Sequence, residues 1–284
     1  MSPADSRRPI QAYLTPKPMR PTVFWRLAED IPKPLYSSLM VVSIAAPLLL
    51  WWLVTSLGNI DPKFLPAPAQ VVGAFGRLWS TGDLLKDTVA SLWRVGVGFF
   101  LAALLSIPVG VLMGSFASIR ALLEPLFALV RYMPAPAFIP LLILYLGIGE
   151  EPKIALIFLG TFFFNSLMVM DTVKFVPKDL IEATYMLGGN RWATLTQVIL
   201  PHILPGIIDA CRINLAAAWQ LVIVSELIAA NEGLGRRISV AGRFLRTDEI
   251  FVGLIVIGVF GLLFDLLFQA LLRLTCRWAS QKRG

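Results

Sequence analysis

"EATYMLGGNRWATLTQVILP", from Glu182 to Pro201, is the stretch that decides how this sequence folds. It lies between two long apolar segments, but it is neither apolar enough to span a bilayer nor loose enough to be a simple connector. Residues 178–187 are good helix formers and predict a first helix, after which Gly188-Gly189 breaks the chain direction. Asn190 can cap a second helix, which Pro201 is expected to end.

The second helix of this stretch is predicted to have one apolar face. Its apolar residues recur at helical spacing, at Trp192, Leu195, Val198 and Ile199. A helical hairpin with one apolar face is suited to docking. The surface that receives it is either the protein's own spans or a cleft on a cytoplasmic partner.

The rest of the chain is strongly apolar. Of its 284 residues, 57% are hydrophobic and 15% are charged, and the mean hydropathy is +0.73. A soluble domain carries about 25% charged residues, so the excess apolar surface predicts a lipid bilayer as partner. The net charge of +7 is assigned to loops that orient the chain rather than to nucleic acid, because no basic cluster is interleaved with aromatics. Cys211 and Cys276 have no metal or disulfide spacing and are expected to be packing residues.

Six segments are apolar enough to cross a bilayer as helices, which predicts an all-α membrane protein with six transmembrane helices. They are residues 39–57, 95–114, 121–146, 154–173, 203–230 and 250–272. The third is interrupted by "RYMPAPAFIP", whose prolines are expected to bend it beside a cavity. The sequence "GVLMG" at 110–114 fits close helix packing.

The spans divide the chain into three parts. Residues 1–38 form an N-terminal arm, in which 22–30 are either an interfacial helix or part of a disordered segment. Residues 39–275 form the six-span domain, with the quoted stretch inside the loop 174–202, and residues 276–284 form a tail. Lys and Arg are more frequent in the arm, in this loop and in the tail, which predicts that both termini are cytoplasmic.

The quoted stretch resembles the "EAA" loop, E-A-A-x3-G-x9-I-x-L-P, of the permease subunits of bacterial binding-protein-dependent ABC importers. Thr184 replaces the second alanine and Val198 the isoleucine. The segments "FLPAPAQVV" (64–72), "GIGEEPKIALI" (147–157), "SELIAANEGLG" (225–235) and "FLRTDEIFVGL" (244–254) are similar to the nitrate/sulfonate/taurine/bicarbonate class of these permeases. The similarity covers about residues 40–275. The class pattern R-P-x-P-P-L-A-W is altered in span three, where Tyr132 stands for the first proline and Phe138 for the tryptophan.

The resemblance implies a type I ABC importer permease, multi-pass in the bacterial inner (plasma) membrane. It would be a homodimer working with two ATP-binding cassette subunits and an extracytoplasmic substrate-binding protein. ATP and Mg would be bound by the ATPase partners, and the chain itself would have no catalytic residue, cofactor or metal. The chain contains no G-x4-G-K-[ST] phosphate loop. The loop helices would lodge in ATPase grooves, and the coupling residues are Glu182, Ala183, Thr184, Leu187, Gly188, Gly189, Leu200 and Pro201.

Polar residues inside spans are the candidates for an anion pathway. A charge inside a span is costly and must face protein or water, which makes Arg131 the first candidate. The other pathway candidates are Met133, Pro134, Phe138, Asn165, Asn214, Gln220 and Glu226. The alternatives are a salt bridge of Arg131 with Glu226 or Glu124, and interhelical hydrogen bonds for the amides.

Further charged residues have mainly structural interpretations. Asp209 and Arg212 lie three apart and are expected to pair, and Asp265 is expected to make a polar contact between helices. Arg236 and Arg237 in the last outer loop are candidates for docking the binding protein, with a solvated loop as the alternative.

Two other classes of protein remain as alternatives. A secondary transporter or channel for small anions would leave the helix–glycine–helix loop unexplained, and no convincing internal repeat supports it. A membrane enzyme has little support because the single histidine, His202, has no carboxylate or cysteine cluster around it. The substrate stays open among nitrate, bicarbonate, taurine and alkyl sulfonates.

Overall fold

The computed structural model describes residues 31–58 and 60–280, and every regular element in these ranges is a helix. The chain divides into two units, residues 1–59 and 60–284. The first contains α1 (Lys33–Leu57), which is long and apolar enough to cross a membrane and begins before the predicted residue 39. The segment 22–30, predicted as an interfacial helix or disordered arm, lies outside the described residues.

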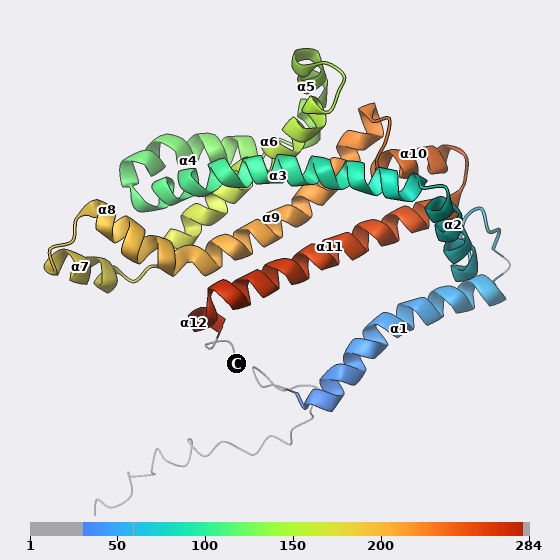
Figure 1. Cartoon of the computed structure of the whole chain (residues 1–284), viewed down its shortest axis with the longest axis horizontal. Coiled ribbons are helices and arrows are strands. Elements are labelled where there is room, and N and C mark those ends of the chain that lie inside the picture. Colours follow the sequence, from blue (N-terminus) through green and yellow to red (C-terminus); the bar gives the residue numbers. More distant parts are fainter. Residues whose placement is uncertain (1–30, 59, 281–284) are drawn as a thin grey trace, which may run out of the picture. The chain divides into compact units, whose positions relative to one another are not determined.

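The second unit contains the other helices (Figure 1). They are α2 (Pro68–Ser80), α3 (Asp83–Ser115), α4 (Ala117–Arg131), η3 (Ala135–Phe138), α5 (Ile139–Leu146), α6 (Glu151–Val173), α7 (Lys178–Met186), α8 (Arg191–Ala193), η4 (Thr194–Ile199), α9 (Leu200–Ala229), α10 (Leu234–Arg243), α11 (Thr247–Thr275) and α12 (Arg277–Ser280). Among the described residues, five helices are suited to cross a membrane, and a bent pair brings the number to six. The all-α, six-span prediction is confirmed.

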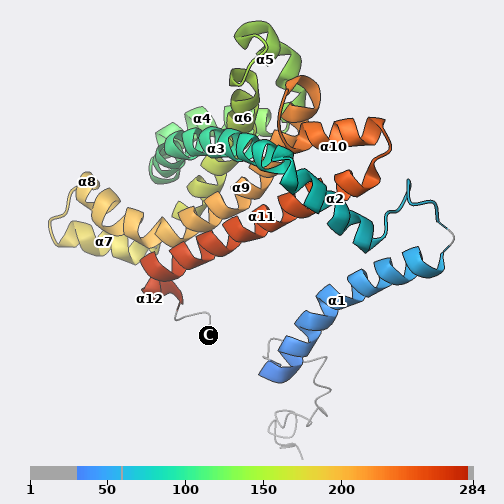
Figure 2. The same cartoon turned by 45° about the vertical axis from the view of Figure 1, so that its right-hand side comes forward.

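Helix α6 is central in the packing of this unit. It packs on α3 along one side and on α9 along another, and α11 packs against α9 (Figure 1 and Figure 2). A buried apolar cluster joins Val111 of α3, Val169 of α6 and Ile207 of α9, and Cys211 lies in the same cluster as a packing residue. The hairpin of α7 and α8 projects from one end of the bundle, whereas α2 and α10 lie at the other end.

The contact between α3 and α6 depends on glycine. A Cβ added to Gly110 would lie 2.5 Å from the carbonyl oxygen of Ser166 and 2.7 Å from Cβ of Val169. A Cβ on Gly114 would lie 2.5 Å from Cβ of Val173. All three distances are shorter than real Cβ contacts, so the close packing predicted from "GVLMG" is confirmed.

Replacing Gly110 with alanine is expected to lower the thermal stability of the purified protein. The added methyl group would meet the α6 backbone, and overpacking of this kind costs about 1–3 kcal/mol. Gly96→Ala, on the same helix, is the matched control, because a Cβ there meets nothing within 4 Å. Equal unfolding temperatures for the two variants in the same detergent would contradict the prediction.

The third predicted span is broken where the sequence predicts a bend. Helix α4 ends at Arg131, and α4 and the η3–α5 segment meet at an angle of 88°. Pro134 and Pro136 lie at the break and supply no backbone N–H to continue the helix. The break leaves irregular backbone between α6 and α9.

The prediction that Pro201 ends the second loop helix is wrong. The helix runs on from Arg191 through Pro201 to Leu227. Residues Thr194–Ile199 form a π-helix, in which the Leu200 N–H donates to the carbonyl of Leu195. The wider turn makes room for the proline ring and needs no backbone N–H from Pro201, so the helix continues without a break.

Candidate functional site

The helical hairpin at 178–201 is built as the sequence predicts around its two glycines. Gly188 has a left-handed φ of +80°, and the Gly189 N–H donates to the carbonyl of Thr184 at 2.9 Å. Any Cβ on Gly189 would lie 2.8 Å from that same carbonyl oxygen. Asn190 caps the next helix, since its Oδ1 accepts from the Ala193 N–H at 2.8 Å.

The apolar residues of the hairpin are divided between two surfaces. Leu195 and Ile199 are buried in the cluster with α6 and α9. Met186, Leu187 and Trp192 are 87%, 89% and 68% exposed. One side of the hairpin is therefore docked on the protein's own spans, and the other presents large apolar side chains at the tip of the fold.

The coupling residues predicted from the resemblance lie on this hairpin and on the helix that follows it. Glu182 and Ala183 are exposed on α7, and Thr184 is partly covered beneath Gly189. Leu200 and Pro201 form the first turn of α9. The structure thus places the predicted set on one continuous segment, from α7 through η4 into a membrane-spanning helix.

A cleft of about 650 Å³ lies between the broken span, α6 and α9. Most of the predicted pathway candidates line it: Arg131, Met133, Pro134, Phe138, Asn214 and Gln220. Asn165 lies behind the lining, buried, where it accepts from Asn214 Nδ2 at 3.2 Å and donates to Ser106 Oγ at 2.7 Å. The Asn165 amide thus makes an interhelical hydrogen bond, which was the alternative to a place in the pathway.

Sequence reasoning missed the aromatic and aliphatic wall of this cleft. The wall includes Gly160, Phe164 and Met168 from α6, and Ile213, Ala217 and Leu221 from α9. Both sets recur at intervals of four residues, which places each on one helix face. That periodicity was the available signal, but in a helix that is apolar on all sides it does not stand out.

Arg131 does not form the salt bridges considered as alternatives. Its Nη2 donates to Tyr132 Oη at 3.3 Å, and its guanidinium carbon lies 5.9 Å from the ring centroid of Phe164. Glu226 is not on the cleft lining but pairs with Arg94, with 2.6 Å between Arg94 Nη1 and Glu226 Oε1.

Arg94 is the centre of a buried ionic network that the sequence analysis did not single out. Its Nη2 donates to Glu150 Oε1 at 2.9 Å, and its Nη1 also donates to the carbonyl of Glu232 at 2.7 Å. Glu226, with a side chain 0% exposed, further accepts from Ser91 Oγ and from the Gly235 N–H, each at 2.8 Å. The network joins α3, α9, the residue that precedes α6 and the loop before α10 at one end of the bundle.

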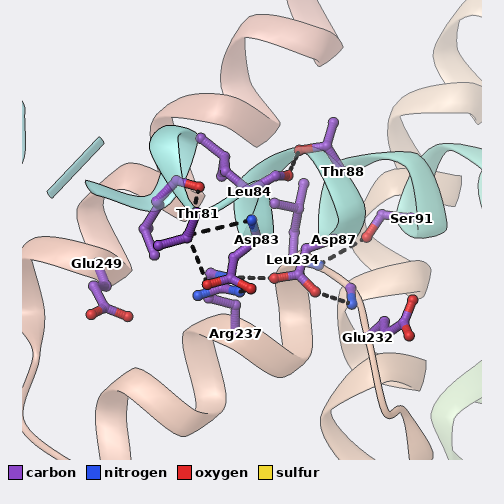
Figure 3. A network of polar contacts seen from close by, with 12 residues as sticks. Thr81, Asp83, Leu84, Asp87, Thr88, Ser91, Glu232, Leu234, Arg237 and Glu249 are labelled. Atoms are coloured by element: carbon purple, nitrogen blue, oxygen red, sulfur yellow. Dashed lines mark hydrogen bonds and ion pairs between the residues drawn. The ribbon is translucent and has the colours of Figure 1, made fainter. Parts of the chain in front are cut away.

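The same face of α3 holds the α9–α10 loop through further contacts (Figure 3). Asp87 accepts from the Gly233 N–H at 2.8 Å and from Arg237, and Ser91 Oγ accepts from the Leu234 N–H at 3.0 Å. Asp87, Ser91 and Arg94 lie at i, i+4 and i+7, so one stripe of α3 makes all these bonds. The docking candidate Arg237 is therefore occupied within the chain, while Arg236 is exposed.

This network lowers the pKa of Glu150. The hydrogen bond from Arg94, with a second from Lys153, lowers the pKa from its ordinary 4.5 to about 2, against an opposing effect of burial. Because the folded pKa is the lower one, the stabilisation is present above about pH 4.5. It is lost as the pH falls toward 2, so Glu150 stays charged at neutral pH.

A second ionic contact lies between α9 and α11. Arg212 binds the carboxylate of Asp265, which also accepts a hydrogen bond from Gln269 Nε2 at 2.8 Å. Arg212 Nη1 also lies 4.0 Å from Asp209 Oδ1. The expected pairing of Asp209 with Arg212 is confirmed, with Asp265 as the nearer partner. Asp265 makes the contact between helices that its position suggested.

A bundle of apolar helices with a cleft between its central helices and an exposed helical hairpin at one end is the architecture of a membrane transport permease. Residues 106–279 match the family described as binding-protein-dependent transport system inner membrane component. The chain belongs to this family, which confirms that it is a transmembrane permease subunit of the ABC importer class.

Relatives and a solved structure agree with this assignment. The chain is 38% identical to the taurine transport system permease protein TauC of Escherichia coli (strain K12), over 90% of this chain and 93% of that protein. It is 32% identical to the putative aliphatic sulfonates transport permease protein SsuC of Bacillus subtilis (strain 168), over 84% of this chain and 87% of that protein. The fold resembles a chain of the MetNI methionine ABC transporter in its inward-facing conformation, with a TM-score of 0.63, 22% identity, and coverage of 69% and 97%.

Proposed function

We propose that this chain forms the transmembrane pathway of an ATP-driven importer of a small anion, and that it does so as a homodimer. Two ATPase subunits bind ATP and Mg on the cytoplasmic side, and an extracytoplasmic binding protein delivers the substrate. Both termini are cytoplasmic in this proposal, which places the α7–α8 hairpin on the ATPase side and α2 and α10 on the outer side. The exposed Arg236 is the remaining arginine of the pair proposed to contact the binding protein.

The observation that carries this proposal is the similarity to the taurine transport permease along nearly the whole chain. The hairpin supports the coupling step, because Met186, Leu187 and Trp192 present an apolar surface that a partner groove would cover. The cleft supports the anion, since Arg131 brings a permanent positive charge to its wall. Nitrate, bicarbonate, taurine and alkyl sulfonates are the substrates to be compared.

Uptake of labelled nitrate, bicarbonate, taurine and butanesulfonate should be measured in cells that express the permease with its ATPase and binding protein. We expect uptake of at least one anion, and we expect ATP depletion to abolish it. Uptake that continues after ATP depletion would contradict the proposal and favour a secondary transporter or channel. Cells that lack only the permease are the control for other uptake routes.

A further inference from the structure

Arg131 is a cation halfway along the membrane bundle, and it has no acidic partner in the described ranges 31–58 and 60–280. Its contacts there are with two aromatic rings and one hydroxyl: the guanidinium carbon lies 5.1 Å from the Tyr132 centroid and 5.9 Å from that of Phe164. Helices α6 and α9 border it with residues from their middle turns. A charge at this depth is costly unless it faces water or a counter-ion.

Two other arginines in the long helices, Arg94 and Arg212, are neutralised. Arg94 binds the carboxylates of Glu226 and Glu150, and Arg212 binds Asp265. Arg131 instead lines a cleft of about 650 Å³, within the usual range for small-molecule sites. Tyr132, at the position where the nitrate/sulfonate class has proline, supplies both the ring and the hydroxyl that hold the guanidinium in place.

The composition of the cleft wall restricts which anion fits it. Apart from Arg131, the polar side chains of the described lining are the amides of Asn214 and Gln220 and the Tyr132 hydroxyl. None of the lining residues in the described part of the chain is Asp or Glu. The remaining wall is apolar, with Met133, Phe138, Phe163, Phe164 and Leu221 among its members.

We propose that this cleft is an intramembrane binding site for a monovalent organic anion with an apolar tail, such as an alkanesulfonate. The sulfonate oxygens accept hydrogen bonds from Arg131, and the tail packs on the apolar wall. Taurine is disfavoured, because its ammonium group meets no carboxylate there. Nitrate and bicarbonate are disfavoured because they have no apolar part to bury. This inference rests on the proposed function, since it places the site on the transport pathway.

The test uses the full chain in complex with its ATPase subunits, reconstituted in nanodiscs without the binding protein. Equilibrium binding of labelled butanesulfonate is measured, with taurine and nitrate as competitors. We expect butanesulfonate to bind about tenfold or more tightly than taurine, since the taurine ammonium leaves water without a carboxylate to pair with it. Arg131→Gln should weaken butanesulfonate binding about tenfold or more, and Arg131→Lys should retain part of it because the charge remains.

Arg273→Gln is the matched control, because it removes an exposed arginine at the end of α11, away from the cleft. Its binding should equal that of the wild type. Absence of butanesulfonate binding to the wild type, equal binding of taurine, or unchanged binding by Arg131→Gln would each overturn the inference. ATP-driven uptake of the same anions is measured in parallel in cells that express the wild-type permease with its ATPase and binding protein. If uptake persists while the binding results fail, only the inference is lost, and if it is absent the proposed function itself is wrong.

Discussion

Replacing Arg94 with methionine is expected to lower strongly both the thermal stability of the protein and the amount of folded protein in the membrane. The side chain of Arg94 is 4% exposed and that of Glu226 is 0% exposed, so the substitution leaves a buried carboxylate without its counter-charge. Removing one partner of a buried ion pair costs about 3–5 kcal/mol, a large part of the stability of an ordinary domain. The contacts to Glu150 and to the carbonyl of Glu232 are lost at the same time.

The measurement is the thermal unfolding temperature and membrane abundance of three variants. Arg94→Met should be the least stable. Arg94→Met combined with Glu226→Gln should recover part of the loss, because no unpaired charge remains in the interior. Arg77→Gln breaks the exposed pair with Asp248 and should stay within about 1 kcal/mol of wild type. Wild-type stability for Arg94→Met would show that the buried ionic network around Arg94 does not hold the helices together.

The second large effect is expected at Gly188. Valine at this position should reduce ATP-driven uptake about tenfold or more, although the protein still inserts and still binds substrate in its cleft. The φ of +80° costs an ordinary residue about 1–2 kcal/mol and a β-branched residue more, so the turn would rearrange. The exposed Met186 and Leu187 that precede it would then point away from the surface that a partner contacts.

Gly188→Asn is the matched control for this variant. Asparagine tolerates the left-handed conformation, so most of the uptake should remain. No atom lies within 4 Å of a Cβ at Gly188, so any difference between the two variants comes from backbone conformation and not from crowding. Uptake by Gly188→Val at the rate of the asparagine variant would contradict the role of the hairpin in coupling.

The hairpin and the cleft differ in how much of each could be predicted from the sequence. The turn and the cap of the hairpin were predicted in detail because their determinants are local: glycines that allow a turn and Asn190 that caps a helix. The single apolar face was predicted only in part, since Leu195 and Ile199 are buried whereas Trp192 is exposed. The cleft was predicted in part. The prolines of span three predicted the break, and Arg131 stood out as a rare charge in an apolar run. The residues of α6 and α9 that form the cleft wall had no distinct pattern in the sequence.

Corrections came where the outcome depended on neighbours in space. Pro201 was predicted to end a helix from its own chemistry, but the π-helical turn before it accommodates the ring. Arg237 was considered a free docking charge, but it binds Asp87, which lies 150 positions earlier in the chain. Helices α2 and α10 were not predicted, because they are short and lie between spans.

The sequence by itself determined that this is a six-span helical permease with a glycine-broken hairpin before its fifth span, because hydrophobic length and backbone preference act over neighbouring residues. Only the tertiary structure decided which charges are neutralised and which are left for a ligand. Arg94 meets Glu226 across 132 positions, and Arg131 meets no acid in the described residues. Ion pairing depends on which helix faces meet, and that is a property of the packed bundle rather than of any one segment.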